Sequence, residues 1–176
     1  MNKETIKDIG VNVCRFVVAL TFVFSGYVKA VDPIGTQYKL NDYLAAVNLE
    51  GSVPDYLTLS ASVLLAAVEL SLGILLLFAI RRRLVSKLIL AFMTVMTAIT
   101  VWIAIADPVK DCGCFGDALK LTNGETLLKN IVLLAASIVV CKWPCAIVRF
   151  IGKANQWIAI NYTILYSIAT STYCLY

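Results

Sequence analysis

The sequence contains no histidine and few charged residues. Lys, Arg, Asp and Glu together make up 15% of its 176 residues. Without histidine the chain lacks the most common general base and the usual ligand of zinc and haem. So low a charge content also excludes a disordered chain, a nucleic-acid-binding tail and an ordinary soluble enzyme. We therefore expect neither a metal nor nucleic acid among its ligands.

Apolar residues, in contrast, are abundant. They make up 60% of the chain, against ~45–50% in a typical soluble domain. A membrane-spanning helix needs ~20 apolar residues, and five stretches fit that length: 11–31, 57–80, 84–106, 127–143 and 157–175. In hydrocarbon each span must pair its own backbone amides, so each should be a helix. The composition predicts one all-α, polytopic transmembrane domain over residues 1–176, embedded in a lipid bilayer.

The basic residues between these stretches are unevenly divided. Nine lie in the N-terminal stretch, the second-to-third connection and the last connection: Lys3, Lys7, Arg81, Arg82, Arg83, Lys87, Lys142, Arg149 and Lys153. The other two connections hold three, Lys39, Lys110 and Lys120. Loops rich in Lys and Arg remain in the cytoplasm. The distribution predicts a cytoplasmic N-terminus, a C-terminus on the outer side, and outer loops at 32–56 and 107–126.

The first outer loop carries a helical pattern. Leu40, Tyr43, Leu44 and Val47 recur at steps of three and four residues. This spacing predicts a short amphipathic helix on the outer surface of the bundle. The alternative is a polar loop with incidental apolar residues.

The topology divides the six cysteines equally between the two sides. Cys14, Cys141 and Cys145 lie toward the reducing cytoplasm, where we interpret them as apolar packing residues. Cys112, Cys114 and Cys174 lie toward the oxidising outer side. Cys174 is either a resolving thiol for the other two or a small residue at the membrane interface.

The pair Cys112 and Cys114 flanks a single glycine in the segment DCGCFGD. A disulfide between them would close a very small ring, for which Gly113 has the necessary backbone freedom. Stabilisation by a disulfide grows with loop length, and strained exposed disulfides exchange readily. The spacing therefore favours redox chemistry. Two alternatives remain: a permanent clip or free thiols, and a thiolate metal site completed by Cys174 or a carboxylate.

Glu69 lies near the centre of the second span. A carboxylate at that depth is costly unless it is protonated or paired, so it should face the interior of the bundle. Three interpretations are open: a proton relay, a contact for a bound ring, and a structural hydrogen-bonding group between helices. We expect Arg15, Lys29 and Lys129 to extend along their helices toward the membrane surfaces.

Two segments resemble a known family. Residues 24–33, FSGYVKAVDP, resemble the end of the first helix in DoxX-like membrane proteins, and residues 111–117, DCGCFGD, resemble a loop of the MauE branch of that superfamily. The resemblance extends to about residue 141. It implies a four-helix core in the bacterial inner membrane, to which the fifth span is an addition. It also implies thiol or sulfur redox chemistry, with a periplasmic thioredoxin-like or other thiol protein as partner and a membrane quinone as electron carrier.

Our functional hypothesis is a thiol–disulfide oxidoreductase. Cys112 and Cys114 would exchange electrons between the periplasmic thiol partner and quinone, and Glu69 would handle a proton or a quinone oxygen. Quinone-dependent enzymes of the VKOR type have a membrane-flanking Cys-x-x-Cys pair, which this chain lacks. Besides Cys112 and Cys114, its one further outer thiol is Cys174. The alternative is a non-catalytic anchor or assembly subunit whose disulfide shapes a docking loop.

The last apolar stretch ends without a polar flank, at Tyr173-Cys174-Leu175-Tyr176. Spans are usually followed by polar residues that hold the helix end among the lipid headgroups. This ending predicts a longer protein, with a thiol-handling partner domain fused on the periplasmic side. The alternative is a natural stop in which the tyrosines anchor the helix.

Overall fold

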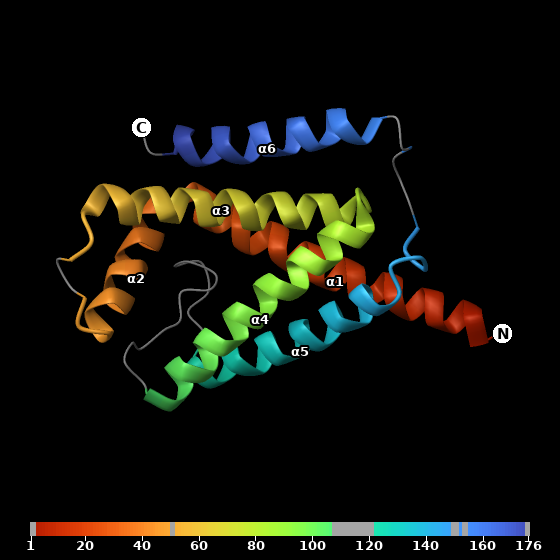
Figure 1. Ribbon diagram of the computed structural model, residues 1–176, viewed down its shortest axis with the longest axis horizontal. Coiled ribbons are helices and arrows are strands. Elements are labelled where there is room, and N and C mark those ends of the chain that lie inside the picture. Colours follow the sequence, from red (N-terminus) through yellow and green to blue (C-terminus); the bar gives the residue numbers. More distant parts are fainter. Residues whose placement is uncertain (1–2, 50–51, 107–121, 149–151, 153–154, 175–176) are drawn as a thin grey trace.

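The computed structural model describes residues 3–49, 52–106, 122–148, 152 and 155–174 (Figure 1). Within these ranges it contains six helices and no strands. The helices are α1 (Lys3–Val31), α2 (Pro33–Ala46), α3 (Asp55–Leu77), α4 (Arg82–Ala106), α5 (Asn123–Lys142) and α6 (Gln156–Tyr173). The predicted all-α class is confirmed.

Four of the helices, α1, α3, α4 and α5, are long and apolar enough to cross a membrane. They coincide with the first four predicted spans. Helix α6 lies where the fifth was predicted, but it is not among the four. Its apolar residues are interrupted by Asn161 and by several hydroxyl side chains. The fifth span therefore stays a prediction.

The long helices run alternately in opposite directions (Figure 1). Helix α1 packs along α3, α4 pairs with α5, and α6 lies along the other side of α3. One end of the bundle carries the start of α1 and the α3–α4 turn, and we call it the N-terminal end. The other end carries α2, and we call it the α2 end. Helix α4 ends and α5 begins at the α2 end.

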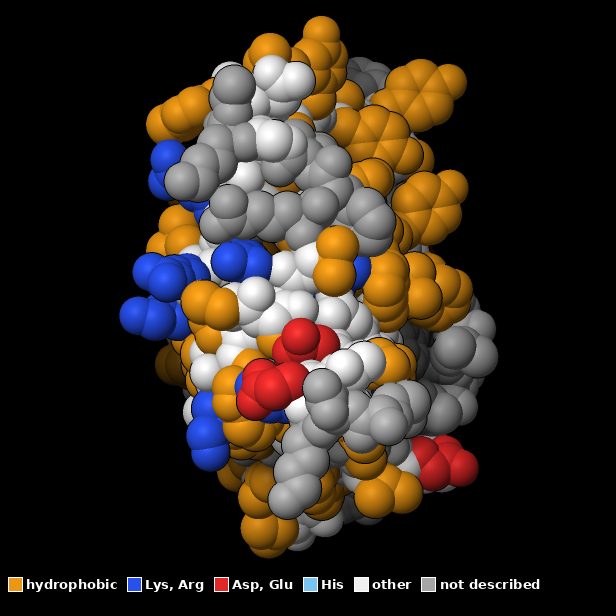
Figure 2. All heavy atoms as spheres, turned by 90° about the vertical axis from the view of Figure 1, so that its right-hand side faces the viewer, with side chains coloured by type: hydrophobic (Ala, Val, Ile, Leu, Met, Phe, Trp, Pro, Cys, Tyr) orange, Lys and Arg blue, Asp and Glu red, His pale blue; other side chains and the backbone are white. Residues whose placement is uncertain are grey.

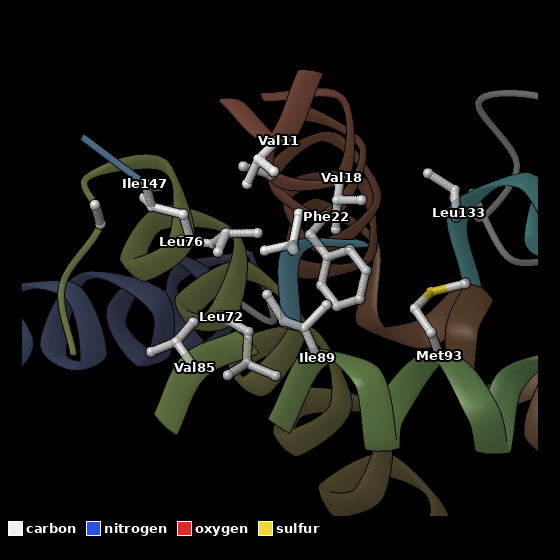
Figure 3. Packing of buried hydrophobic residues seen from close by; sticks show 13 residues of the cluster. Val11, Val18, Phe22, Leu72, Leu76, Val85, Ile89, Met93, Leu133 and Ile147 are labelled. Carbon is white, nitrogen blue, oxygen red and sulfur yellow. The ribbon is translucent and has the colours of Figure 1, made fainter. Parts of the chain in front are cut away.

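The core joins the first, third, fourth and fifth helices (Figure 3). Phe22 of α1 meets Phe92 of α4 edge to face, with 5.4 Å between ring centroids. Around this contact lie Leu76 of α3, Ile89 of α4 and Leu133 of α5. Large apolar side chains also cover the outside, such as Leu64, which is 64% exposed. A surface this apolar suits contact with lipid and not with water.

Hydroxyl groups lie inside the bundle, where a soluble protein would place carbon. Thr97, Ser137 and Ser167 are buried. Each donates to the carbonyl four residues earlier in its own helix, at 2.7–2.8 Å. These bonds satisfy the hydroxyl without water, and small polar residues of this kind are common where membrane helices pack together.

Helix α2 begins with a defined cap. The Asp32 side chain accepts a hydrogen bond from the Gly35 amide at 2.8 Å, and Pro33 occupies the first turn. Both features favour a helix start. A helix thus forms where the apolar spacing predicted one. Its amphipathic character and its position on the outer membrane surface stay predictions.

At the N-terminal end, polar side chains fasten residues 145–148 to the helices. Arg82 of α4 donates to the carbonyls of Cys145 and Ile147, at 3.1 and 2.6 Å. From α1, Asn12 donates to the Ala146 carbonyl at 3.0 Å, and Arg15 donates to the Val148 carbonyl at 2.9 Å. Arg15 is 1% exposed. The expectation that it extends to the membrane surface is wrong, because its guanidinium is buried and donates to the Val148 carbonyl inside the protein.

The N-terminal end is also rich in positive charge. Figure 2 views it directly and shows Lys and Arg side chains gathered toward one side of it, with hydrophobic side chains at its edges. The α3–α4 turn contributes Arg81, Arg82 and Arg83. Arg81 lies over the Trp157 ring at 4.8 Å and so connects this turn to the start of α6.

Candidate functional site

A buried ion pair joins the first and third helices. Lys29 Nζ lies 2.5 Å from Glu69 Oε2, and the two side chains are 6% and 7% exposed. Glu69 therefore faces the interior and has a partner, as predicted for a carboxylate at this depth. The expectation that Lys29 extends to the membrane surface is wrong.

The offset between α1 and α3 explains why Lys29 turns inward. Ser62, on the second turn of α3, donates to the Pro33 carbonyl at 2.9 Å. Helix α1 therefore ends about two turns short of the level at which α3 begins. Lys29 lies at the level of Glu69 and not near the membrane surface. Its ammonium also donates to Ser25 Oγ at 3.0 Å, one turn back on α1.

Two glycines bring the helices close enough for this pair to form. A Cβ on Gly26 of α1 would overlap the backbone of Leu70 on α3. A Cβ on Gly73 of α3 would lie 2.7 Å from the Val23 amide nitrogen on α1. Since Glu69 precedes Leu70, the close approach places its carboxylate within reach of Lys29. Residues of the segment 24–33 thus have distinct structural roles. Ser25 accepts a hydrogen bond from Lys29, Gly26 allows the helix contact, Lys29 forms the ion pair, and Asp32 caps α2.

A small cavity of about 30 Å³ lies beside the pair. It is lined by α1, α3, α4 and α5 through Thr21, Phe22, Ser25, Lys29, Glu69, Phe92, Met93, Met96, Lys129, Asn130 and Leu133. Its volume suits about one water molecule. Asn130 also donates to Thr100 Oγ1 at 3.2 Å and so connects α5 to α4. Lys129, expected at the outer surface, is half-buried and contributes to this lining.

The arrangement has a defined chemical capability. A carboxylate and an ammonium in contact can exchange a proton with each other or with a water molecule in the cavity. Charged pairs inside a membrane are costly and often mark the path of a proton or an ion. They also hold helices together. The cavity itself is too small for a quinone ring, so a ring could contact this pair only from outside it.

Cys112 and Cys114 lie outside the described residues. The described chain leaves α4 at Ala106 and resumes at Thr122, where Thr122 and Glu125 form a capping box that begins α5. Both points lie at the α2 end of the molecule (Figure 1).

The other cysteines occupy different settings. Cys174 is exposed at the C-terminal cap of α6, also at the α2 end. Cys14 is half-buried against the core, in agreement with a packing role. Cys145 is exposed at the N-terminal end, and its Sγ lies 3.7 Å from Arg83 Nη2. No group of three or more Cys, Asp or Glu side chains suited to a metal occurs among the residues described.

Sequence reasoning found Glu69 but missed its partner. The sequence feature that pointed to an inward-facing Lys29 was its position four residues after Ser25, on the same face of a helix. That spacing cannot show that α1 ends below the start of α3. The pairing therefore required the tertiary arrangement.

Comparison with known proteins gives one family match. The model of the family described as methylamine utilisation protein MauE matches residues 7–143. The matched range includes Lys29, Glu69, Cys112 and Cys114, and it ends before α6. No curated protein and no solved structure matches the chain.

Proposed function

We propose, from the premise that this chain belongs to the MauE family, that it is an inner-membrane thiol–disulfide redox protein. Cys112 and Cys114 exchange electrons between an extracytoplasmic thiol protein, of thioredoxin-like type, and a membrane quinone. The observation that carries the proposal is the Lys29–Glu69 pair, buried beside a polar cavity within an apolar bundle. An ionisable pair at this depth supports the handling of protons, which any exchange between thiols and quinone requires.

The proposed reaction has two steps, a thiol–disulfide exchange with the partner and a transfer of electrons and protons to quinone. A partner thiolate attacks the Cys112–Cys114 disulfide and forms a mixed disulfide, which the second partner thiol resolves. The partner is then a disulfide, and Cys112 and Cys114 are a dithiol. When their disulfide reforms, two electrons and two protons leave the dithiol, and a membrane quinone accepts both to become quinol. Run in reverse, the same steps reduce the partner.

Glu69 and Lys29 have a proton role in this scheme. The pair accepts a proton released on dithiol oxidation and returns it toward the acceptor oxygen. Its burial keeps that proton apart from bulk water. Cys174 is the third outer thiol, and in the reverse direction it would resolve the mixed disulfide by displacing the reduced partner from Cys112 or Cys114.

We place α6 across the membrane as a fifth span. Its buried residues are the hydroxyl-bearing Thr163, Ser167 and Ser171, whereas Ile158 and Leu165 are exposed by 57% and 65%. A helix in water would show the opposite pattern. Ser71 on α3 donates to Ser167 Oγ at 3.0 Å, which supports docking of the polar face. With the basic N-terminal end in the cytoplasm, Cys174 and the Cys112–Cys114 segment lie in the periplasm.

Serine substitution of the two cysteines tests the function. The purified protein in lipid nanodiscs would be given dithiothreitol and a short-chain quinone, and quinone reduction followed by absorbance. We expect Cys112→Ser and Cys114→Ser each to abolish the reaction while the protein still inserts and folds. Cys14→Ser is the matched control and should retain it. With the physiological partner, one of the single variants should trap a mixed disulfide.

Wild-type activity in the double serine variant would refute the redox proposal. The non-catalytic anchor would then be favoured, and loss of binding to the partner would be its readout.

A further inference from the structure

A second hollow in the molecule lies at the α2 end. It is a groove of about 560 Å³ between α2, the start of α3 and the end of α4. Its walls include Leu40 and Tyr43 of α2, Leu57 and Ala61 of α3, and Ile99 and Trp102 of α4. None of the described residues that line it carries a formal charge. The volume lies within the ~300–1,000 Å³ typical of small-molecule sites.

The groove is continuous with the surface that faces the bilayer. Leu57, Ile99 and Trp102 are 48%, 39% and 39% exposed, and they adjoin the apolar outer faces of α3 and α4. A ligand can therefore enter sideways from the hydrocarbon. The walls formed by the described residues are uncharged and almost wholly apolar, so they favour an uncharged, apolar ligand.

We infer that the groove binds the ring end of a membrane quinone. The inference rests on the proposed function, which requires a quinone, and on the volumes of the two hollows. The cavity beside Lys29 and Glu69 has room for about one water molecule, whereas the groove has room for a ring with part of its prenyl chain. Tyr43 and Trp102 supply aromatic side chains against which a quinone ring can pack.

The position of the groove suits this role. It lies at the end of the bundle where the described chain leaves at Ala106 and resumes at Thr122. Along α4, Ile99 in the groove is three residues from Met96, which lines the polar cavity. A bound ring would therefore lie along α4 between its described end at Ala106 and the level of the polar cavity.

Fluorescence of Trp102 provides a direct test. The chain has three tryptophans, and the Trp143→Phe/Trp157→Phe variant leaves Trp102 as the single emitter. In nanodiscs, titration with a short-chain ubiquinone analogue should quench this emission with saturation. Ala61→Phe fills the groove and should weaken the apparent affinity at least about tenfold. Ala91→Phe makes the same change at an exposed position of α4 outside the groove, and should leave the titration unchanged.

Brominated phospholipids distinguish the other candidate occupant, a lipid acyl chain. We expect Ala61→Phe to leave quenching by these lipids unaltered. If it weakens quenching by lipid and by quinone alike, the groove holds an acyl chain and the inference fails. Equal quinone affinity in Ala61→Phe and in the parent variant would overturn it as well.

Quinone binding in the groove and the redox cycle of Cys112 and Cys114 can be tested separately. Saturable quenching that Ala61→Phe weakens, in a protein that oxidises no dithiol, supports the groove and refutes the redox cycle. Dithiol-dependent quinone reduction at the parental rate in Ala61→Phe supports the cycle and overturns the groove.

Discussion

At the scale of single residues, the Lys29–Glu69 pair shows how an apolar bundle tolerates charge. Each partner is paired in a medium of low dielectric constant, and Ser25 gives the ammonium a second acceptor. A buried pair of this kind adds little to stability relative to apolar residues of the same size. Loss of one partner, however, leaves an uncompensated charge inside the protein.

The first prediction concerns this asymmetry. Lys29→Met or Glu69→Leu alone should lower the free energy of unfolding by about 3–5 kcal/mol, and the double variant should recover most of the loss. Denaturant unfolding in detergent micelles, arranged as a double-mutant cycle, measures the coupling between the two positions. Losses that simply add would mean that the pair does not form.

The second prediction separates proton transfer from structural support. The double variant Lys29→Gln/Glu69→Gln keeps polar side chains of similar length but removes both charges. We expect near-parental unfolding and quinone reduction slowed by roughly 10²-fold, which is typical for loss of a general acid or base. Parental turnover in this variant would assign the pair a purely structural role.

At the scale of helices, contact between α1 and α3 depends on two positions without side chains. Gly26 meets the Leu70 backbone, and Gly73 meets the Val23 backbone. Both contacts involve backbone atoms, which cannot move aside as a flexible side chain can. For Gly10, on the same α1 helix, no described residue outside the neighbouring turns of the helix comes within 4 Å of the Cβ that it would carry.

The third prediction uses this difference. Gly26→Ala should force the helices apart and destabilise the protein by about 1–3 kcal/mol, and it should also weaken the Lys29–Glu69 contact. Gly10→Ala should be neutral or stabilise by up to ~1 kcal/mol, because Ala loses less conformational entropy than Gly in a helix. Thermal unfolding of the two variants compares them directly. The same sign of change in both would contradict the close approach of α1 and α3.

At the scale of the whole molecule, the two ends of the bundle differ in charge and in the groups that they expose. The N-terminal end carries the arginines of the α3–α4 turn, and Figure 2 shows Lys and Arg side chains gathered there. The α2 end carries the groove and Cys174. Cys145 and Cys174 are both exposed, and they lie at opposite ends. They therefore report on the orientation of the protein and on whether α6 crosses the membrane.

The fourth prediction follows from this pair of thiols. In intact spheroplasts that express the Cys112→Ser/Cys114→Ser variant, a membrane-impermeant maleimide should label Cys174. Cys145 should react only after the membrane is opened. Labelling of both thiols from the same side would show that α6 does not span, and the reverse pattern would invert the orientation.

The sequence by itself determined the positions of the helices. In hydrocarbon each segment must satisfy its own backbone, so the length and composition of each apolar stretch define four spans without reference to neighbours. The helix at Pro33–Ala46 also followed from local signals, since Asp32 and Pro33 begin it and the apolar spacing continues it. Glu69 was recognised as inward-facing for the same kind of reason, the cost of an exposed carboxylate in lipid.

The tertiary structure alone decided which groups meet. Lys29 pairs with Glu69 because α1 ends about two turns below the start of α3, and that offset depends on the Ser62–Pro33 contact and on Gly26. Arg15 is buried where the Val148 carbonyl, 133 positions along the chain, accepts its hydrogen bond. The groove likewise exists only where α2, α3 and α4 converge. Such contacts join residues dozens of positions apart, and hydropathy, which is read along the chain, contains no information about the relative heights of packed helices.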